Sequence, residues 1–141
     1  MALRYLLDTN ICIYIHRQKP PEVLARFQRL KPGDAAISVV TYGELLYGAQ
    51  KSRLREQVLE RLQQFVELVP ILPLPLDAGE HYGAIRADLE AKGTIIGGNG
   101  LWIAAHARTI GVAVVTNDDD EFRRVPGLKV QNWARPRGLQ P

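Results

Sequence analysis

The stretch "LRYLLDTNICIYIHR", residues 3–17, contains the unit on which the fold is built. It begins with a short apolar run that ends in polar residues, which is typical of a strand buried on both faces. The residues that follow have the apolar spacing of a helix, and we expect Thr9 to cap it. An acid, Asp8, stands at the junction. The stretch therefore predicts a buried strand that leads directly into a helix.

The rest of the chain repeats this alternation. The elements expected after residue 17 are, in chain order, a helix in 20–30, a strand in 35–40, helices in 41–49 and 53–69, a proline-rich edge strand or connector in 70–76, helices in about 77–92 and 101–110, a strand in 112–116, a short helical piece and a strand near 128–131. Asp77 and Glu80 form a capping-box pattern at the start of the helix in 77–92. Gly111 is expected to end the helix in 101–110. The alternation predicts an α/β fold with a parallel sheet flanked by helices on both faces. Such folds bind ligands beyond the carboxyl ends of their strands.

Length and composition are those of an ordinary globular protein. The chain has 141 residues, 46% of them hydrophobic and 23% charged, which fits one domain over residues 1–141 and excludes a disordered chain. No apolar run approaches the ~20 residues of a membrane span and no signal peptide is evident, so we expect a cytoplasmic protein without membrane contact. The single cysteine, Cys12, excludes an internal disulfide and is expected to lie in the core.

Charge is unevenly distributed near the end of the chain. The formal net charge is +3, but five Lys or Arg residues and no acid occur from Phe122 onward, directly after the run "DDDE". A cationic surface around an acidic focus suits a polyanion held beside a metal site, whereas a solvated basic terminus is the simpler alternative. The candidate phosphate-binding cations are Arg17, Lys19, Arg123 and Arg124.

Three acids stand where a parallel sheet gathers the ends of its strands. Asp8 follows the first strand, Glu44 lies in the first turn of the helix after the second, and Asp118 follows the strand "VAVVT". Each has a local alternative, since Asp8 is able to cap a helix, Glu44 to complete a capping box with Thr41, and Asp118 to serve as a turn residue. Their common position at one crevice favours a shared site.

Carboxylates gathered in one crevice need a cation, because like charges raise one another's pKa and destabilise the fold. Carboxylates together with an amide such as Asn10 favour Mg²⁺ or Mn²⁺ as that cation. The three histidines show no metal-binding spacing and are expected to be structural or surface residues; they are His16, His81 and His106. A hard divalent ion polarises a phosphoryl oxygen and activates water without a Ser or Cys nucleophile. The pattern therefore indicates metal-dependent hydrolysis of a phosphodiester.

Four motifs in this order resemble those of the PIN-domain ribonuclease toxins of the bacterial VapC type. They are "YLLDTNICIYI", "SVVTYGELLYGA", "IGGNGLWIAAHA" and "VVTNDDDEF", and "GLKVQNW" closes the resemblance. It implies a PIN fold, a Mg²⁺- or Mn²⁺-dependent endoribonuclease that is the toxin of a type II toxin–antitoxin system, and a homodimer. It also implies a cognate VapB-type antitoxin that blocks the active site and takes the complex to promoter DNA. Close relatives in this family cleave initiator tRNA in the anticodon loop.

The resemblance also assigns roles to individual positions. The first, second and fourth family acids and metal ligands match Asp8, Glu44 and Asp118, and the polar residues around them match Asn10, Thr116 and Asn117. The third acid is missing, because relatives read like "IGxxDLxIAAHA" and this chain has Gly100 in place of the aspartate. We interpret Gly100 as a natural or engineered replacement. Residual metal binding is expected, with RNA cleavage reduced by roughly 10² or more.

Other interpretations use the same residues differently. The "GGNG" run at 97–100 precedes a helix and could bind a phosphate in a nucleotide-binding module, but it lacks the GxGxxG and GxxxxGK[ST] spacings. A haloacid-dehalogenase-like phosphatase needs an Asp where Asn10 stands, and a response-regulator receiver needs a lysine that Lys129 places poorly. The strongest alternative is a catalytically inactive PIN domain that acts by binding RNA or its antitoxin.

Overall fold

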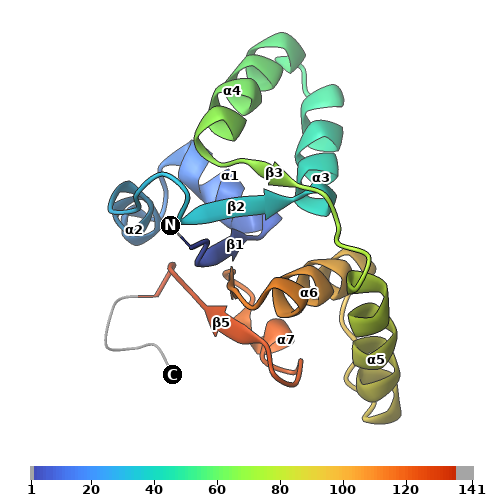
Figure 1. Ribbon diagram of the computed structural model, residues 1–141. Coiled ribbons are helices and arrows are strands. Elements are labelled where there is room, and N and C mark those ends of the chain that lie inside the picture. Colours follow the sequence, from blue (N-terminus) through green and yellow to red (C-terminus); the bar gives the residue numbers. More distant parts are fainter. Residues whose placement is uncertain (1, 136–141) are drawn as a thin grey trace.

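The computed structural model describes residues 2–135, which form a sheet between helices (Figure 1). The strands are β1 (Tyr5–Leu7), β2 (Ala35–Ser38), β3 (Ile71–Leu72), β4 (Ala113–Val115) and β5 (Lys129–Gln131). The helices are α1 (Thr9–Arg17), α2 (Pro21–Gln28), α3 (Val39–Gln50), α4 (Arg55–Leu68), α5 (Ala78–Ala91), α6 (Gly98–Ile110) and α7 (Asp119–Phe122). The strand order is β3-β2-β1-β4-β5 and every pairing is parallel, which confirms the predicted α/β fold.

Strand β1 lies at the centre of the sheet. Leu6 pairs with Ala36 of β2 on one side and with Val114 of β4 on the other. All three residues of β1 are buried, as expected for a strand covered on both faces. The proline-flanked β3 lies at the edge of the sheet, as predicted, where a missing N–H interrupts no ladder.

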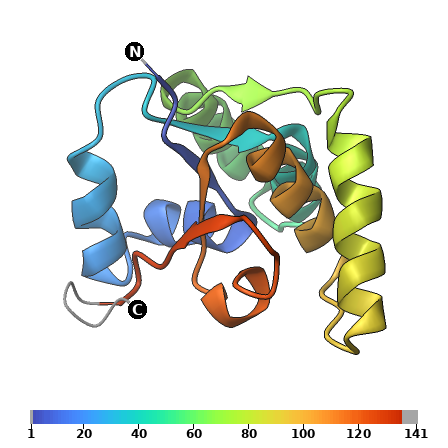
Figure 2. The same cartoon turned by 60° about the horizontal axis from the view of Figure 1, so that its bottom comes forward.

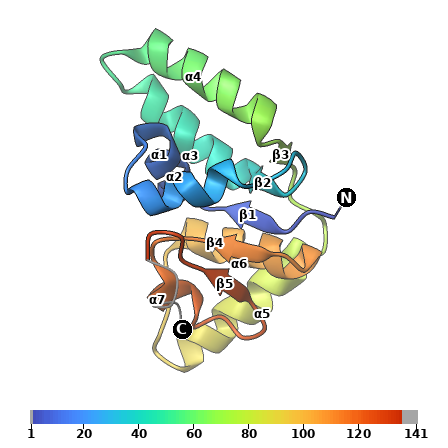
Figure 3. The ribbon, with the colours of Figure 1, turned by 90° about the vertical axis from the view of Figure 1, so that its left-hand side faces the viewer.

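Two hydrophobic clusters pack on opposite faces of the sheet. Successive strand side chains point to opposite faces, so Leu6 belongs to one cluster and Tyr5 and Leu7 to the other. The Leu6 cluster contains most of the buried residues of α5 and α6, and the other contains those of α1 and α2. Figures 2 and 3 show α1 and α2 on one side of the sheet and α5 on the other. Helices α3 and α4 pair with each other and project beyond the sheet (Figure 1).

The first helix begins one residue earlier than the sequence predicts. Asp8 is the N-cap of α1, and its Oδ1 accepts a hydrogen bond of 2.9 Å from the backbone N–H of Ile11. Thr9 is the first residue of the helix, so the prediction that it caps α1 is wrong. The acid provides the cap because its carboxylate reaches the free N–H groups of the first turn.

Strand β2 is shorter than expected. It ends at Ser38, whose hydroxyl accepts a hydrogen bond from the N–H of Val40 and caps α3. Helix α3 therefore begins at Val39, although the β-branched pair 39–40 favours a strand. Glu44 therefore lies beyond the first turn, although the sequence analysis placed it in that turn, and the alternative of a capping box with Thr41 is also wrong because Ser38 caps α3.

Helices α5 and α6 end close to the residues predicted from the sequence, but their first turns differ from the prediction. The side chain of Asp77 makes no capping hydrogen bond at the start of α5, so the second expected capping box is also wrong. Helix α6 begins at Gly98 and ends at Ile110, and the next residue, Gly111, caps it with a φ of 75°, the left-handed conformation that glycine favours.

None of the helices in residues 2–135 has the length and hydropathy needed to span a membrane.

Candidate active site

The candidate site lies beyond the carboxyl ends of the central strands. Asp8 directly follows β1 and Thr116 directly follows β4, and the N–H of Asp8 donates to the carbonyl of Val115 (3.0 Å), which keeps the two strand ends in register. Glu44 reaches the same region from α3, which follows β2 without a loop. Parallel pairing thus brings together acids that are far apart in the sequence.

Asp8 is the buried acid of the site. It is 6% exposed, and burial raises its pKa to about 6. Hydrogen bonds from Thr116 and from the N–H of Ile11 oppose this rise, and the negative charges of Glu44 and Asp118 add to it. Asp8 therefore caps α1, and it also interacts electrostatically with the other two acids.

Glu44 is held by Thr9, which the sequence analysis predicted to be the cap of α1. The Oγ1 of Thr9 donates a 2.6 Å hydrogen bond to Oε1 of Glu44, which joins α1 to α3. Thr9 therefore orients an acid of the site instead of capping a helix. These two residues are 35 positions apart in the chain, so no local pattern could have revealed the pair.

Asp118 is the exposed acid of the site. Its N–H donates to Oγ1 of the fully buried Thr116 (2.8 Å), and the same threonine hydrogen-bonds to Asp8. Thr116 therefore connects two of the predicted acids. Asn117 instead turns toward α1, where its Nδ2 donates to the hydroxyl of Tyr14 (3.0 Å), and Asn10 is exposed in the first turn of α1.

Glu121 is an acid of this region that the sequence analysis did not single out. A hydrogen bond with Asp118, burial and the charge of Asp118 raise the pKa of Glu121, and Arg124 opposes that rise. Its position three residues after Asp118 places both on one side of the short α7 segment, and this spacing within "DDDE" was the available signal.

Gly100 occupies the first turn of α6, on the side of the fold that carries α7. A β-carbon built at this position would lie 3.6 Å from Cδ1 of Ile96 and 3.8 Å from Cζ of Phe122, which are ordinary van der Waals distances. Phe122 belongs to α7, directly after Glu121. The backbone therefore does not require glycine here, and a side chain at residue 100 would emerge beside the segment that follows Asp118.

The donor set has the chemistry of a site for a hard divalent cation but is small. Its oxygens come from carboxylates. Burial is the main cause of the raised pKa of Asp8, and the charges of Glu44 and Asp118 add a smaller repulsion that a cation would relieve. In the described part of the chain, however, no group of three or more His, Cys, Asp or Glu side chains is arranged to hold a metal ion. Gly100, where the sequence resemblance implies a further acid, adds no carboxylate to this set.

The histidines lie in other settings. His16 is exposed beside Arg61, His81 accepts a hydrogen bond from Nε of Arg108 (2.8 Å), and His106 is buried in α6. These positions agree with the prediction that they are structural or surface residues.

Two of the four candidate phosphate-binding cations are engaged within the protein. Arg123 contacts the buried carboxylate of Asp119 (3.3 Å), and Arg124 lies 3.4 Å from the carbonyl oxygen of Ile95. Arg17 and Lys19, at the end of α1, are exposed. Of the four candidates, Arg17 and Lys19 are therefore better placed than Arg123 and Arg124 to contact a phosphate.

An apolar groove of about 440 Å³ lies between α1, α3 and α4 and reaches Glu44. We call it the α1/α3/α4 groove; its lining includes Cys12, Leu45, Val58, Leu62 and Phe65, with Arg17 and Arg61 as cationic members. Helix α4 contributes to it and has no fully buried residue of its own. A partner in this groove would lie next to Glu44.

The fold and the site together are those of a PIN domain, and residues 5–128 match the PIN domain family. The chain belongs to this family. It is 42% identical to the tRNA(fMet)-specific endonuclease VapC of Shigella flexneri and 40% identical to Ribonuclease VapC2 of Haemophilus influenzae, over 132 residues that cover 94% of this chain and 99% of each relative. Within the family, the chain is therefore of the VapC type.

A solved structure gives the same result. The structure of VapBC2 from Rickettsia felis bound to a DNA fragment from their promoter matches this chain with a TM-score of 0.85 and 37% identity, covering 94% of this chain and 99% of that one. This membership favours the PIN interpretation over the phosphate-loop, phosphatase and receiver alternatives.

Proposed function

We propose that this chain is the ribonuclease toxin of a type II toxin–antitoxin system and that it hydrolyses RNA phosphodiester bonds with Mg²⁺ or Mn²⁺. The observation that carries the proposal is the buried carboxyl of Asp8 at the strand ends of a PIN-domain sheet, whose pKa is raised to about 6 mainly by burial and further by the charges of Glu44 and Asp118 beside it. The activity in the name of the Shigella flexneri relative favours initiator tRNA as the substrate. Such a substrate places the protein in the cytoplasm.

The chemistry would combine one ion with the hydrogen bonds described above. When bound, the ion supplies a polarised phosphoryl oxygen and a water of lowered pKa. Asp8, Glu44 and Asp118 would hold it. Thr116 orients Asp8 and the backbone of Asp118, and Thr9 orients Glu44. With a pKa of about 6, Asp8 is largely deprotonated at neutral pH and is available as a ligand.

Gly100 is the weak point of this site. An aspartate there would add a full negative charge beside α7, so its absence should weaken metal binding and water activation. We expect RNA cleavage to be reduced by roughly 10² or more, which is the penalty typical of losing a key electrostatic group. The competing proposal is an inactive PIN domain that acts by binding RNA or antitoxin.

We further propose that a VapB-type antitoxin occupies the α1/α3/α4 groove. The groove is apolar and is lined in part by Glu44, so a segment seated in it would contact one of the three candidate metal ligands. Contact with promoter DNA would come only through the antitoxin. The Rickettsia felis complex, which contains VapB and promoter DNA, supports this assignment for a relative.

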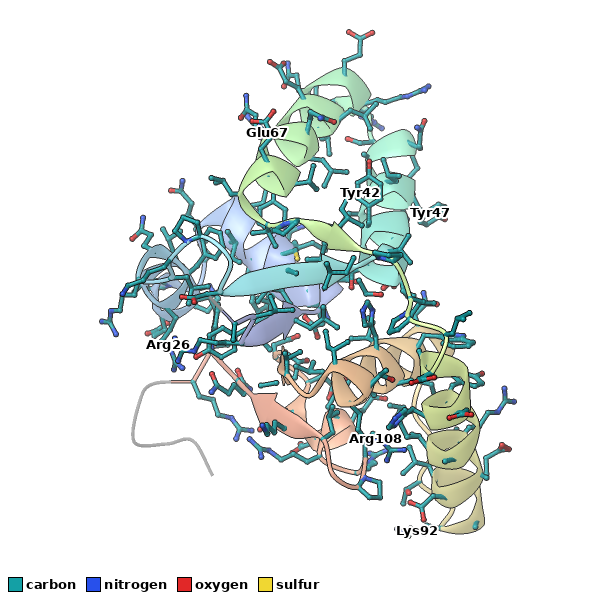
Figure 4. The ribbon with its side chains drawn as sticks, in the orientation of Figure 1. Arg26, Tyr42, Tyr47, Glu67, Lys92 and Arg108 are labelled. Carbon is teal, nitrogen blue, oxygen red and sulfur yellow. The ribbon has the colours of Figure 1, made fainter. Side chains whose placement is uncertain are left out.

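A homodimer is the expected assembly. Helix α3 carries exposed apolar side chains on its outer face, where Val39 is 42% exposed and Tyr47 is 66% exposed. Figure 4 shows Tyr47 pointing away from the body of the protein. Exposed apolar side chains of this kind are typical of a protein interface.

The decisive experiment restores the missing acid. RNA cleavage is measured for this chain and for Gly100→Asp over a Mn²⁺ titration, with initiator tRNA as the substrate. Gly100→Asp should be faster by roughly 10² or more. Gly98→Asp is the matched control, because it adds the same charge to the first turn of α6 at an exposed position where a β-carbon meets nothing within 4 Å.

The outcome separates the two candidate functions. Equal cleavage by this chain and Gly100→Asp would contradict the proposed role of Gly100. RNA binding without turnover, unchanged by Gly100→Asp, would favour the inactive PIN domain. Gly100→Asn fills the same space without the charge, and it should leave the rate low.

A further inference from the structure

Asn132 lies at the carboxyl end of β5, in the closing motif "GLKVQNW", and is 3% exposed. Its Nδ2 donates to the carbonyl oxygen of Asn117 (3.4 Å) and to Oδ1 of Asp119 (3.1 Å). Its Oδ1 accepts from the N–H of Ala134 (2.9 Å), which fixes the orientation of the amide. Asn132 therefore holds the two residues on either side of Asp118.

Asp119 is a buried anion that strengthens this attachment. Its Oδ2 lies 3.3 Å from Nε of Arg123 and 3.1 Å from Nη1 of Arg135. Burial alone would raise the pKa of Asp119, but hydrogen bonds from Asn132 and Arg123 and the charge of Arg135 outweigh it and lower the pKa. These contacts fix the carboxylate of Asp119 directly beside the exposed Asp118.

The position of Asp118 depends on these attachments. Its own side chain is exposed, so packing does little to hold it. Its N–H donates to Thr116, and Thr116 in turn hydrogen-bonds to Asp8. The turn is therefore held by Thr116 on the side of Asp8 and by Asn132 on the side of β5.

We propose that Asn132 is a positioning residue for the metal site. By holding the backbone of Asn117 and the carboxylate of Asp119, it sets the place of Asp118 relative to Asp8. Loss of such a supporting hydrogen bond typically lowers metal affinity or activity 10- to 100-fold. The inference rests on the proposed function, in which Asp118 is a metal ligand.

The test uses Asn132→Ala in the Gly100→Asp background. Gln131→Ala is the matched control, because Gln131 lies at the same strand end but its Oε1 accepts from Arg26 (3.2 Å) and Trp133 (3.0 Å). Figure 4 shows Arg26 on the outer side of this strand end. Three quantities are measured: amide hydrogen exchange of Asp118, Mn²⁺ affinity, and kcat and KM for RNA cleavage.

Asn132→Ala should accelerate exchange at the Asp118 amide by roughly tenfold or more and lower Mn²⁺ affinity and kcat by roughly tenfold, with little change in KM. Gln131→Ala should change none of them. Asn132→Ser, which keeps one hydroxyl donor, should show the same changes to a smaller extent, and it replaces Asn132→Ala if that variant does not fold.

A double-mutant cycle with Asp118→Asn separates positioning from general destabilisation. If Asn132 acts through Asp118, adding Asn132→Ala to Asp118→Asn causes no further loss of Mn²⁺ affinity; fully additive losses would overturn the inference. If Gly100→Asp with an intact Asn132 cleaves no RNA, the proposed function fails. The inference is then decided by the exchange and Mn²⁺ measurements, and unchanged exchange at Asp118 would overturn it.

Discussion

Replacing Asp8 with Asn should make the metal-free protein more stable at neutral pH. The pKa of Asp8 is raised from 3.8 to about 6 by burial and by neighbouring acids, so the folded state disfavours the ionised form. A change in pKa of this size corresponds to roughly 3 kcal/mol of folding free energy at pH 7. Asparagine removes the charge and still caps α1 well. It cannot accept as many hydrogen bonds as the carboxylate, and losing one from Thr116 costs about 1 kcal/mol, which leaves a net gain of roughly 2 kcal/mol.

The sign of the pH dependence follows from the same change. The folded state binds a proton at Asp8 more tightly than the unfolded state does, so this residue favours folding below about pH 4, and the contribution is lost as the pH rises through about 6. Burial lowers the pKa of His106, which acts in the opposite direction as the pH falls. The informative quantity is therefore the difference between the parent chain and Asp8→Asn, because His106 contributes equally to both.

Urea unfolding in EDTA, at about pH 5 and about pH 7.5, measures this difference. The variant should have the larger free energy of unfolding at the higher pH, and its advantage should shrink at the lower pH. Mn²⁺ should then stabilise the parent chain and not the variant, because a ligand that binds only the folded state raises its stability. A variant that is no more stable at the higher pH, or whose advantage does not depend on pH, would refute the reasoning.

Two further predictions concern Asp119 and the groove. Asp119→Ala should lower the free energy of unfolding by roughly 2 kcal/mol, because Arg123, Arg135 and Asn132 lose the carboxylate that they share. The two arginines are partly exposed, so water replaces part of the lost interaction. Urea unfolding at neutral pH checks this, and a loss below ~1 kcal/mol would contradict it. Leu62→Asp should abolish binding of a VapB-type antitoxin, because it places a charge in the apolar α1/α3/α4 groove. Leu68→Asp is the control and should bind normally, because Leu68 is 70% exposed and lies outside that groove. Calorimetry measures both affinities. Equal affinities of the two variants would place the antitoxin elsewhere.

The sequence by itself determined the architecture and the location of the acids. Apolar runs such as the one that ends at Leu7 have no polar face, so they have to be covered on both sides, and the helices between them impose parallel pairing. The carboxyl ends of parallel strands meet at one edge, so Asp8 and Asp118 had to lie near each other. The sequence also places Gly100 where the resemblance implies a third acid, and Gly100→Asp tests that prediction.

Only the tertiary structure decided how these acids are held. The start of α3 depends on the hydroxyl of Ser38, which overrides the strand preference of the β-branched residues after it. Thr9 donates a hydrogen bond to Glu44, 35 residues away in the chain, and Asn132 donates one to Asp119, 13 residues away. Both bonds form because the strand order of the sheet brings the elements that carry these residues together. The pKa of Asp8 likewise depends on burial and on distant charges, and neither is encoded in its local sequence. Local patterns specify elements, whereas the contacts that tune a site form only after the elements pack.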